Sequence, residues 1–306
     1  MILNRIHTAI HPKLRFNQNG FQQKCTTVMQ ILALRRIIKK VKKNNLPAVL
    51  TFIDFRKAFD SIHRGEMLKI LKAYEVPDHL LRTIESSYTE TMAEVVSPDG
   101  EIAVFELLAA VLQGDTLAPY IFIIVLDYAL RQATKVHDKL GFTIKPARTE
   151  RIRPVMLTDL DFAEGIVLLS DQMEEAQQLL TKVEIECNKV GLHLNAKKTE
   201  YMAFNCNEGI LKTVKNDTIK KVLDFKYLGS RMLSLKKDIK IRKVLAWSGM
   251  NDMKEIWSSN LTRGLKKRIF LAVIVHSHVR MRDVDTHQDH AKVTRWLLYT
   301  NAPDGS

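Results

Sequence analysis

Residues 157–170 read L-T-D-L-D-F-A-E-G-I-V-L-L-S, which is the pattern of a strand, a two-residue turn and a second strand. The pattern places Glu164 and Gly165 at the turn. Side chains alternate along a strand, so Asp161 and Glu164 belong to opposite faces. Asp161 therefore cannot replace a carboxylate that is missing at position 165. The stretch is either an ordinary hairpin or a metal-binding turn that has lost part of its ligand set.

The segments around this hairpin predict an α+β fold with an antiparallel sheet. Strands and helices are mixed without a βαβα rhythm, which argues against a doubly wound sheet. Helical patterns occupy 26–45, 64–74, 78–91, 116–134, 172–190 and the chain from 231 to about 275, and strands or hairpins are predicted at 48–55, 92–106, 154–170, 198–204 and 219–230.

The charge of the chain is unevenly distributed around a formal net charge of +13. Residues 1–60 carry 12 Lys and Arg against 2 Asp and Glu, residues 61–210 carry 15 against 23, and residues 211–282 carry 18 against 5. Basic flanks can bind nucleic acid by releasing counterions from its phosphates. An acidic centre repels the same phosphates unless metal cations lie between them. The structural alternative is that the basic helices are simply solvated faces.

The sequence gives no sign of a membrane protein or a secreted one. The longest apolar run, Tyr120–Leu126, is far shorter than the roughly 20 residues of a membrane span, and no secretory signal is present. Three scattered cysteines without a C-x-x-C pair suit a reducing compartment. We therefore expect an intracellular protein of the cytoplasm or the nucleus, with no membrane partner.

Two carboxylates at strand ends are candidate metal ligands. Asp54 ends the apolar run 48–55, where an unpaired buried carboxylate would be costly. It is either a cap or salt-bridge partner or a metal ligand. Together with Glu164 on an adjacent antiparallel strand, it could hold divalent cations for in-line phosphoryl transfer. Mg²⁺ favours such a site, because it binds a few carboxylates together with substrate phosphates.

The stretch V-L-Q-G-D-T-L-A-P at 111–119 is a glycine-bearing loop that opens a helix. Gly114 permits close backbone approach, and Gln113 offers an amide to a base or sugar edge. Asp115 or Thr116 could cap the helix. As structure alone, the stretch is simply a helix start.

Taken in order, these segments resemble the reverse transcriptase domain of non-LTR (LINE-like) retrotransposons. The resemblance covers about residues 2–275. Six stretches carry it: N-Q-N-G-F-Q at 17–22 (fingers), F-I-D-F-R-K-A-F-D-S-I-H at 52–63 (first palm motif), V-L-Q-G-D-T-L-A-P-Y-I-F at 111–122 (second), L-D-F-A-E-G-I-V-L-L at 160–169 (third, which normally ends in two Asp), V-G-L-H-L-N-A-K-K-T-E at 190–200 (fourth) and F-K-Y-L-G-S at 225–230 (primer grip).

The resemblance implies a right-hand polymerase fold in a partial and degenerate copy. Partial fingers are expected at 1–46, a palm with an antiparallel sheet at 47–232, a helical thumb-like region at 233–275 and a divergent tail at 276–306.

The resemblance also implies roles for single residues. Asp54 and Glu164 would be the catalytic metal ligands, and Lys197 or Lys198 would face the leaving pyrophosphate as acid or countercharge. Phe59 would exclude a ribose 2′-hydroxyl. The other roles are in binding: Gln113, Gly114 and Asp115 at the nascent pair and template, and Tyr227, Leu228 and Gly229 at the primer end.

The implied reaction is DNA synthesis from deoxynucleoside triphosphates with two Mg²⁺, on an RNA template and a DNA primer, with no obligate protein partner evident. Glu164 displaces its carboxylate by about 1.5 Å relative to Asp, and Mg²⁺ tolerates little distortion. Gly165 removes the second carboxylate. We therefore expect polymerase activity to be weak or absent. Residual activity with Mn²⁺ and a catalytically dead nucleic-acid-binding remnant with no selected function remain as alternatives.

Overall fold

The computed structural model describes residues 2–89, 91–96, 102–106, 111, 115–135, 140–146 and 154–278. The chain forms two compact units. The first consists of Met1–Thr26 and Asn44–Val222, and the second of Thr27–Lys43 and Leu223–Ser306.

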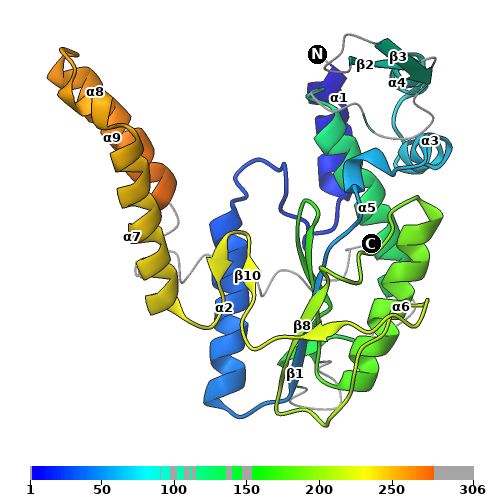
Figure 1. Ribbon diagram of the computed structural model, residues 1–306. Helices are drawn as coiled ribbons and strands as arrows, with labels where there is room; N and C mark the ends of the chain where they lie inside the picture. Colours follow the sequence, from blue (N-terminus) through cyan, green and yellow to red (C-terminus); the bar gives the residue numbers. More distant parts are fainter. Residues whose placement is uncertain are drawn as a thin grey trace. The chain divides into compact units, whose positions relative to one another are not determined.

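A five-stranded sheet with the order β6-β7-β1-β8-β9 forms the frame of the first unit (Figure 1). The central strand β1 is antiparallel to both β7 and β8, and all of its residues are buried. Only the short pair β8–β9 is parallel. The strands are β1 (Ala48–Ile53), β6 (Asp159–Phe162), β7 (Gly165–Ser170), β8 (Glu200–Phe204) and β9 (Lys220–Lys221). The predicted α+β fold with an antiparallel sheet is confirmed.

The other elements of the first unit are helices and two small hairpins. They are α1 (Ile2–Ile10), η1 (His11–Lys13), η2 (Ala58–Asp60), α3 (Arg64–Ala73), α4 (Asp78–Tyr88), α5 (Ala118–Lys135), α6 (Met173–Lys189) and the pairs β2–β3 (Met92–Val96, Ile102–Glu106) and β4–β5 (Phe142–Lys145, Val155–Leu157). The predicted helices and the hairpin at 92–106 are confirmed. Helix α1 was missed, although buried Ile6 and Ile10 have helical spacing.

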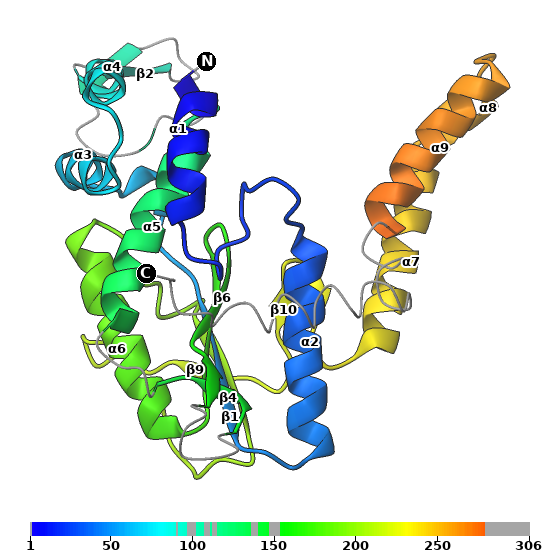
Figure 2. The same ribbon diagram turned by 180° about the vertical axis from the view of Figure 1, so that it is seen from behind.

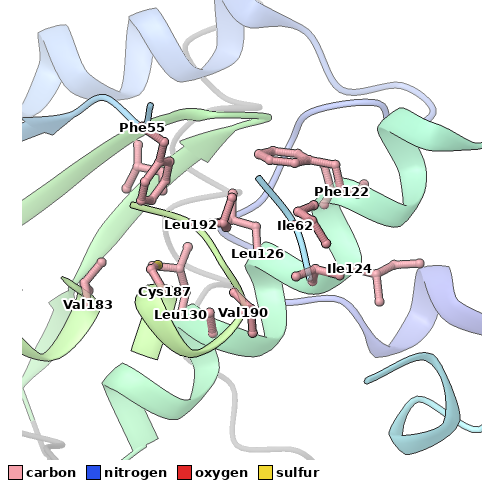
Figure 3. Close-up of a cluster of buried hydrophobic side chains, with 14 of the residues drawn as sticks. Phe55, Ile62, Phe122, Ile124, Leu126, Leu130, Val183, Cys187, Val190 and Leu192 are labelled. Atoms are coloured by element: carbon pink, nitrogen blue, oxygen red, sulfur yellow. The ribbon is translucent and has the colours of Figure 1, made fainter. Parts of the chain in front are cut away.

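Helices α5 and α6 pack together on one side of the sheet (Figure 2). The apolar run Tyr120–Leu126 lies in α5 and is almost fully buried, which explains its lack of polar residues. Figure 3 shows Leu126 and Leu130 of α5 beside Cys187 of α6. Burial raises the pKa of the Cys187 thiol, so this cysteine is a packing residue.

The β6–β7 hairpin turns one residue earlier than the sequence pattern predicts. Phe162 pairs with Gly165, so Ala163 and Glu164 are the turn residues and Gly165 begins β7. Ala163 has a φ of +53°, a left-handed conformation that costs a residue with a side chain about 1–2 kcal/mol. The prediction was wrong because glycine is the residue expected at such a turn.

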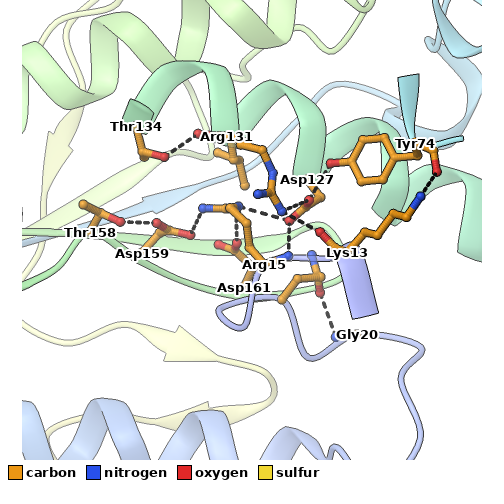
Figure 4. A network of polar contacts seen from close by, with 12 residues as sticks. Lys13, Arg15, Gly20, Tyr74, Asp127, Arg131, Thr134, Thr158, Asp159 and Asp161 are labelled. Atoms are coloured by element: carbon orange, nitrogen blue, oxygen red, sulfur yellow. Dashed lines mark hydrogen bonds and ion pairs between the residues drawn. The ribbon is translucent and has the colours of Figure 1, made fainter. Parts of the chain in front are cut away.

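A buried ionic network anchors strand β6 (Figure 4). The Arg15 guanidinium lies 3.0 Å from Asp127 of α5 and 2.8 Å from each of Asp159 and Asp161 of β6. All three carboxylates are fully buried. The Tyr74 hydroxyl also donates a hydrogen bond to Asp127, at 2.6 Å. The network joins the segment after α1 to a helix and a strand that lie far along the chain.

The two aspartates of β6 differ in how well they carry a charge. Burial and the neighbouring Asp159 raise the pKa of Asp161 well above its usual value. Burial also disfavours the charge of Asp159, but Arg15 and hydrogen bonds outweigh this and lower its pKa. Both side chains are buried, whereas Glu164 lies in the turn after β6 and is exposed.

The second unit contains one helix from the N-terminal part and the C-terminal elements. They are α2 (Thr27–Lys43), β10 (Lys226–Tyr227), β11 (Ser230–Arg231), α7 (Leu235–Asp252), α8 (Lys254–Ser258) and α9 (Arg263–His278). Arg35 of α2 donates hydrogen bonds to the Ser230 hydroxyl at 3.0 Å and the Arg231 carbonyl at 2.9 Å. Asp238 of α7 accepts a hydrogen bond from Ser230 at 2.7 Å. These contacts fix the β10–β11 hairpin between α2 and α7.

The helices predicted at 26–45 and from 231 to about 275 are confirmed. The functional division into fingers, palm, thumb and tail remains a prediction. Across the described ranges, none of the helices combines the length and the apolar character that crossing a membrane requires.

The unequal charges of β6 predict unequal mutational costs. At pH 7, we expect Asp159→Asn to lower the free energy of unfolding by about 3 kcal/mol, because it breaks a buried pair in which the carboxylate is favourably charged. Asp161→Asn should cost less than about 1 kcal/mol, because the raised pKa shows that its charge is disfavoured. Urea unfolding of both variants measures the difference, and equal costs would contradict this description of the network.

Candidate functional site

Asp54 lies directly after the central strand, and a neighbouring turn fixes it. The Asp54 carbonyl accepts a hydrogen bond from the Asn195 N–H at 2.8 Å, and Asn195 Nδ2 donates to Asp54 Oδ2 at 3.1 Å. The Asp54 N–H donates to the Thr199 hydroxyl oxygen at 3.2 Å. Sequence reasoning gave no role to Asn195 or Thr199, although both belong to the fourth motif-like stretch. The half-buried carboxylate is therefore held at a defined place on the edge of the sheet.

The β6–β7 turn lies on the strand next to Asp54. Ile53 pairs with Ile166, so continuing the register by one residue sets Asp54 opposite Gly165. Glu164 precedes this position, and its side chain is exposed at the turn. The structure thus brings the two predicted carboxylates to the ends of adjacent antiparallel strands.

The donor set at this edge is incomplete for a pair of cations. Asp54 and Glu164 offer two carboxylates, and Gly165, opposite Asp54, offers none. In the part of the chain that the structure describes, His, Cys, Asp and Glu side chains nowhere gather in threes to form a metal site. Two cations that each need six oxygen ligands would depend mainly on water and substrate here.

The two predicted lysines lie in the turn that holds Asp54. Lys197 and Lys198 are both exposed, and the Lys198 N–H donates to the Asn195 carbonyl at 3.1 Å. Asn195 also bonds Asp54. The same turn therefore holds the Asp54 carboxylate and presents the two lysine side chains.

Phe59 lies in the short helix η2 and is held from two sides. Its ring stacks on the buried ring of Phe122 in α5, with centroids 4.4 Å apart. Its carbonyl accepts a hydrogen bond from the Val111 N–H at 2.9 Å. The structure therefore joins the first and second motif-like stretches at this residue.

The second stretch is described only in part. Asp115 is exposed, and its Oδ1 accepts a hydrogen bond from the Leu117 N–H at 3.1 Å, just before α5 begins. The contact forms a local turn before the helix and does not reach the N–H groups of its first turn, so capping by Asp115 remains a prediction. Gln113 and Gly114 lie outside the described residues.

The predicted primer-grip residues belong to the second unit. Tyr227 ends β10 and is buried. Leu228 and Gly229 form the turn to β11, with φ angles of +46° and +77°. The turn is therefore a tight two-residue connection in which both residues are left-handed.

Sequence reasoning missed a contact between residues 17–20 and the turn of the β6–β7 hairpin. Gln18 is buried, and its Oε1 accepts hydrogen bonds from the N–H groups of Ala163 at 2.9 Å and Gly20 at 2.7 Å. Its Nε2 donates to the Ala163 carbonyl at 3.3 Å. A Cβ on Gly20 would lie 2.1 Å from the Ala163 nitrogen, so only glycine fits there. The only signal in the sequence was the N-Q-N-G pattern itself.

Comparison with known proteins identifies the family. A model described as reverse transcriptase (RNA-dependent DNA polymerase) matches residues 1–232. The retrovirus-related Pol polyprotein from the type-1 retrotransposable element R2 of Nasonia vitripennis is 28% identical over 189 residues, which are 61% of this chain and 17% of that protein. The corresponding protein of Popillia japonica is 26% identical over 173 residues, 56% of this chain and 27% of the relative. The chain thus spans less than a third of the length of these relatives.

Solved structures of telomerase are also similar. Apo telomerase from Candida tropicalis, truncated from its C-terminal domain, has a TM-score of 0.48 and 10% identity. This match covers 75% of this chain and 42% of the telomerase chain. Telomerase from Candida albicans in complex with a fragment of telomeric RNA has a TM-score of 0.49 and 12% identity, and the match covers 98% of this chain and 51% of the telomerase chain. Both scores are below 0.5, so the assignment rests on the family match.

The family match covers 232 of the 306 residues and includes all six motif-like stretches in full. The predicted resemblance to the reverse transcriptase domain of a non-LTR retrotransposon is confirmed, and with it the right-hand polymerase fold. The chain belongs to the reverse transcriptase (RNA-dependent DNA polymerase) family.

Proposed function

We propose that this chain is a reverse transcriptase domain built for RNA-templated DNA synthesis whose catalysis is weak or absent. The observation that carries the proposal is the placement of Asp54 opposite the β6–β7 turn, where the sequence has Glu164 and Gly165. An RNA template, a DNA primer and deoxynucleoside triphosphates are the proposed substrates. The nucleic-acid partners agree with the two basic flanks of the sequence.

The weakness of the site lies in its metal ligands. Reverse transcriptases generally use divalent metals. Two such cations would stabilise the attacking and the leaving oxygens of the nucleotidyl transfer. Asp54 and Glu164 are the proposed ligands for Mg²⁺, but Glu164 reaches further than Asp and Gly165 supplies no oxygen. Since a displacement of 1 Å can cost about 10²-fold in rate, the set does not fit efficient catalysis.

The remaining roles are proposed for residues other than 164 and 165. Phe59, with its ring fixed on Phe122, would exclude a ribose 2′-hydroxyl from the nucleotide site. Lys197 or Lys198 would face the leaving pyrophosphate from the turn that holds Asp54. Tyr227 and the turn after it would hold the primer end. These roles depend on side chains that the changes at 164 and 165 leave untouched.

The alternative function is nucleic-acid binding without catalysis. Residues 211–282 carry 18 Lys and Arg against 5 Asp and Glu, and these charges do not depend on the metal ligands. Such a domain would retain salt-sensitive affinity for an RNA–DNA duplex even if its chemistry were lost.

Restoring the ligands should restore catalysis. We expect no measurable primer extension on an RNA template by the unaltered chain in Mg²⁺, and extension at least about 10²-fold faster by the double variant Glu164→Asp, Gly165→Asp. The chain contains a second Glu-Gly pair at 208–209, so Glu208→Asp, Gly209→Asp is the matched control and should not extend.

Two results would contradict this proposal. Extension by the unaltered chain as fast as by the double variant would show that Glu164 and Gly165 do not impair the site. Extension that survives Asp54→Ala in the double variant would show that Asp54 is not part of it.

The proposed discrimination against ribonucleotides can be tested in the active double variant. Adding Phe59→Val should raise ribonucleotide incorporation relative to deoxynucleotide incorporation by about tenfold or more, because it removes the ring that excludes the 2′-hydroxyl. Phe16→Val is the control, since Phe16 is 49% exposed and has no proposed contact with the nucleotide. The ratio of kcat/KM for the two nucleotides is the measurement, and equal ratios in both variants would refute the role of Phe59.

The alternative function, nucleic-acid binding without catalysis, can be tested by measuring the affinity for an RNA–DNA duplex at several salt concentrations. The logarithm of the affinity should fall linearly with the logarithm of the salt concentration. Replacing the exposed Lys267 and Arg268 of α9 with Ala should reduce the slope by about 2 if both contact phosphates. Replacing the exposed Lys72 and Arg82 of α3 and α4 should leave it unchanged. Affinity that is independent of salt would exclude this kind of binding.

A further inference from the structure

We propose that Gln18 is a positioning residue that holds the β6–β7 turn in its left-handed conformation and thereby fixes where residue 164 lies relative to Asp54. The inference rests on the proposed function, because it names the group that shapes one edge of that site. We call the pair of contacts between the Gln18 amide and Ala163 the Gln18 clamp.

The clamp satisfies both polar groups of one backbone residue. Gln18 Oε1 accepts from the Ala163 N–H at 2.9 Å, and Gln18 Nε2 donates to the Ala163 carbonyl at 3.3 Å. A side-chain amide is suited to this task because it carries a donor and an acceptor in one plane. Gln18 is 1% exposed and Ala163 4%, so water does not compete strongly for these bonds.

The clamp acts where the backbone needs support. Ala163 adopts a φ of +53° without being glycine, a conformation that persists in residues with a side chain only when their surroundings enforce it. In this turn the Gln18 amide bonds both polar groups of the strained residue. The clamp therefore offsets the free-energy cost of the left-handed conformation at Ala163.

Gln18 is itself held in place on both sides. Before it, Arg15 binds Asp159 and Asp161 (Figure 4). Around it, the Asp161 N–H donates to the Asn17 carbonyl at 3.1 Å, and the Asn19 N–H donates to the Asp161 carbonyl at 2.9 Å. The segment thus runs beside β6 as a short additional pairing, and the amide cannot shift without breaking it.

The clamp matters for the site because it bonds the residue next to Glu164, inside the turn that the Phe162–Gly165 pair closes. Glu164 is exposed, and its carboxylate makes no hydrogen bond or ion pair with any residue of the described ranges. Its place is therefore set by the backbone of the turn. A turn that changed its conformation would move the residue at 164 while leaving Asp54 where Asn195 and Thr199 hold it.

The first test measures hydrogen exchange at the Ala163 amide, which needs no catalytic activity. Gln18→Ala should speed exchange at this amide by about tenfold or more, because it removes the acceptor, while Leu168 in the paired part of β7 stays protected. Gln18→Met keeps the side-chain volume and should have the same local effect if the alanine variant folds poorly. Gln23→Ala, at an exposed glutamine of the same loop, should change nothing.

The second test separates positioning from stabilisation in the double variant Glu164→Asp, Gly165→Asp. Adding Gln18→Met should lower kcat by about tenfold or more and leave the KM for the nucleotide within about twofold. Adding Ala163→Gly as well should recover the melting temperature, because glycine adopts the turn without strain, but not kcat, because a glycine turn is free to move.

The outcomes distinguish the inference from the proposed function. Unchanged exchange at Ala163 in both Gln18 variants overturns the clamp. Recovery of kcat together with the melting temperature overturns positioning and leaves only relief of strain. If the double variant does not extend primers at all, the proposed function fails, and the exchange result still decides whether Gln18 holds the turn.

Discussion

The buried guanidinium of Arg15 is the point on which the geometry of the first unit depends. It binds Asp127 of α5 and both Asp159 and Asp161 of β6, and breaking its buried pair with Asp159 should cost about 3 kcal/mol. The segment after α1, helix α5 and strand β6 must therefore stay together. Gln18 follows Arg15 by three residues. The contacts that hold Arg15 on β6 therefore also place the Gln18 amide beside the β6–β7 turn.

The parts of the fold that follow local rules could be predicted from the sequence. Helices α2 to α6 show apolar spacing, and strand β1 is a continuous β-rich run. The antiparallel pairing of β6 with β7 was also predicted, although the turn between them was placed one residue too late. What failed depended on distant contacts: Arg15 finds Asp127 and Asp159 at separations of 112 and 144 residues, and the turn lies at Ala163 because Gln18, 145 residues away, bonds it. A prediction that places turns at glycine residues takes no account of a distant side chain such as that of Gln18.

The candidate site shows a contrast between its supports and its ligands. Asn195 and Thr199 hold Asp54, Phe122 holds Phe59, and Gln18 holds the turn. These contacts shape a site, but at the turn itself Glu164 and Gly165 stand where the family pattern has two aspartates. The proposal is therefore of a catalytic site whose metal ligands are incomplete although other side chains around it are held by the contacts above. It explains why we expect two substitutions, and not a rebuilt fold, to recover chemistry.

The measurement that tests this account most directly is a crystal structure of the double variant Glu164→Asp, Gly165→Asp grown with Mn²⁺, whose anomalous scattering locates the ion. The account predicts an anomalous peak between the Asp54 carboxylate and the altered turn, and a weak peak or none at the same place in the unaltered chain under identical conditions. A peak of equal strength in both chains would show that Glu164 and Gly165 do not impair the site. A peak in neither would show that this edge of the sheet is not a metal site.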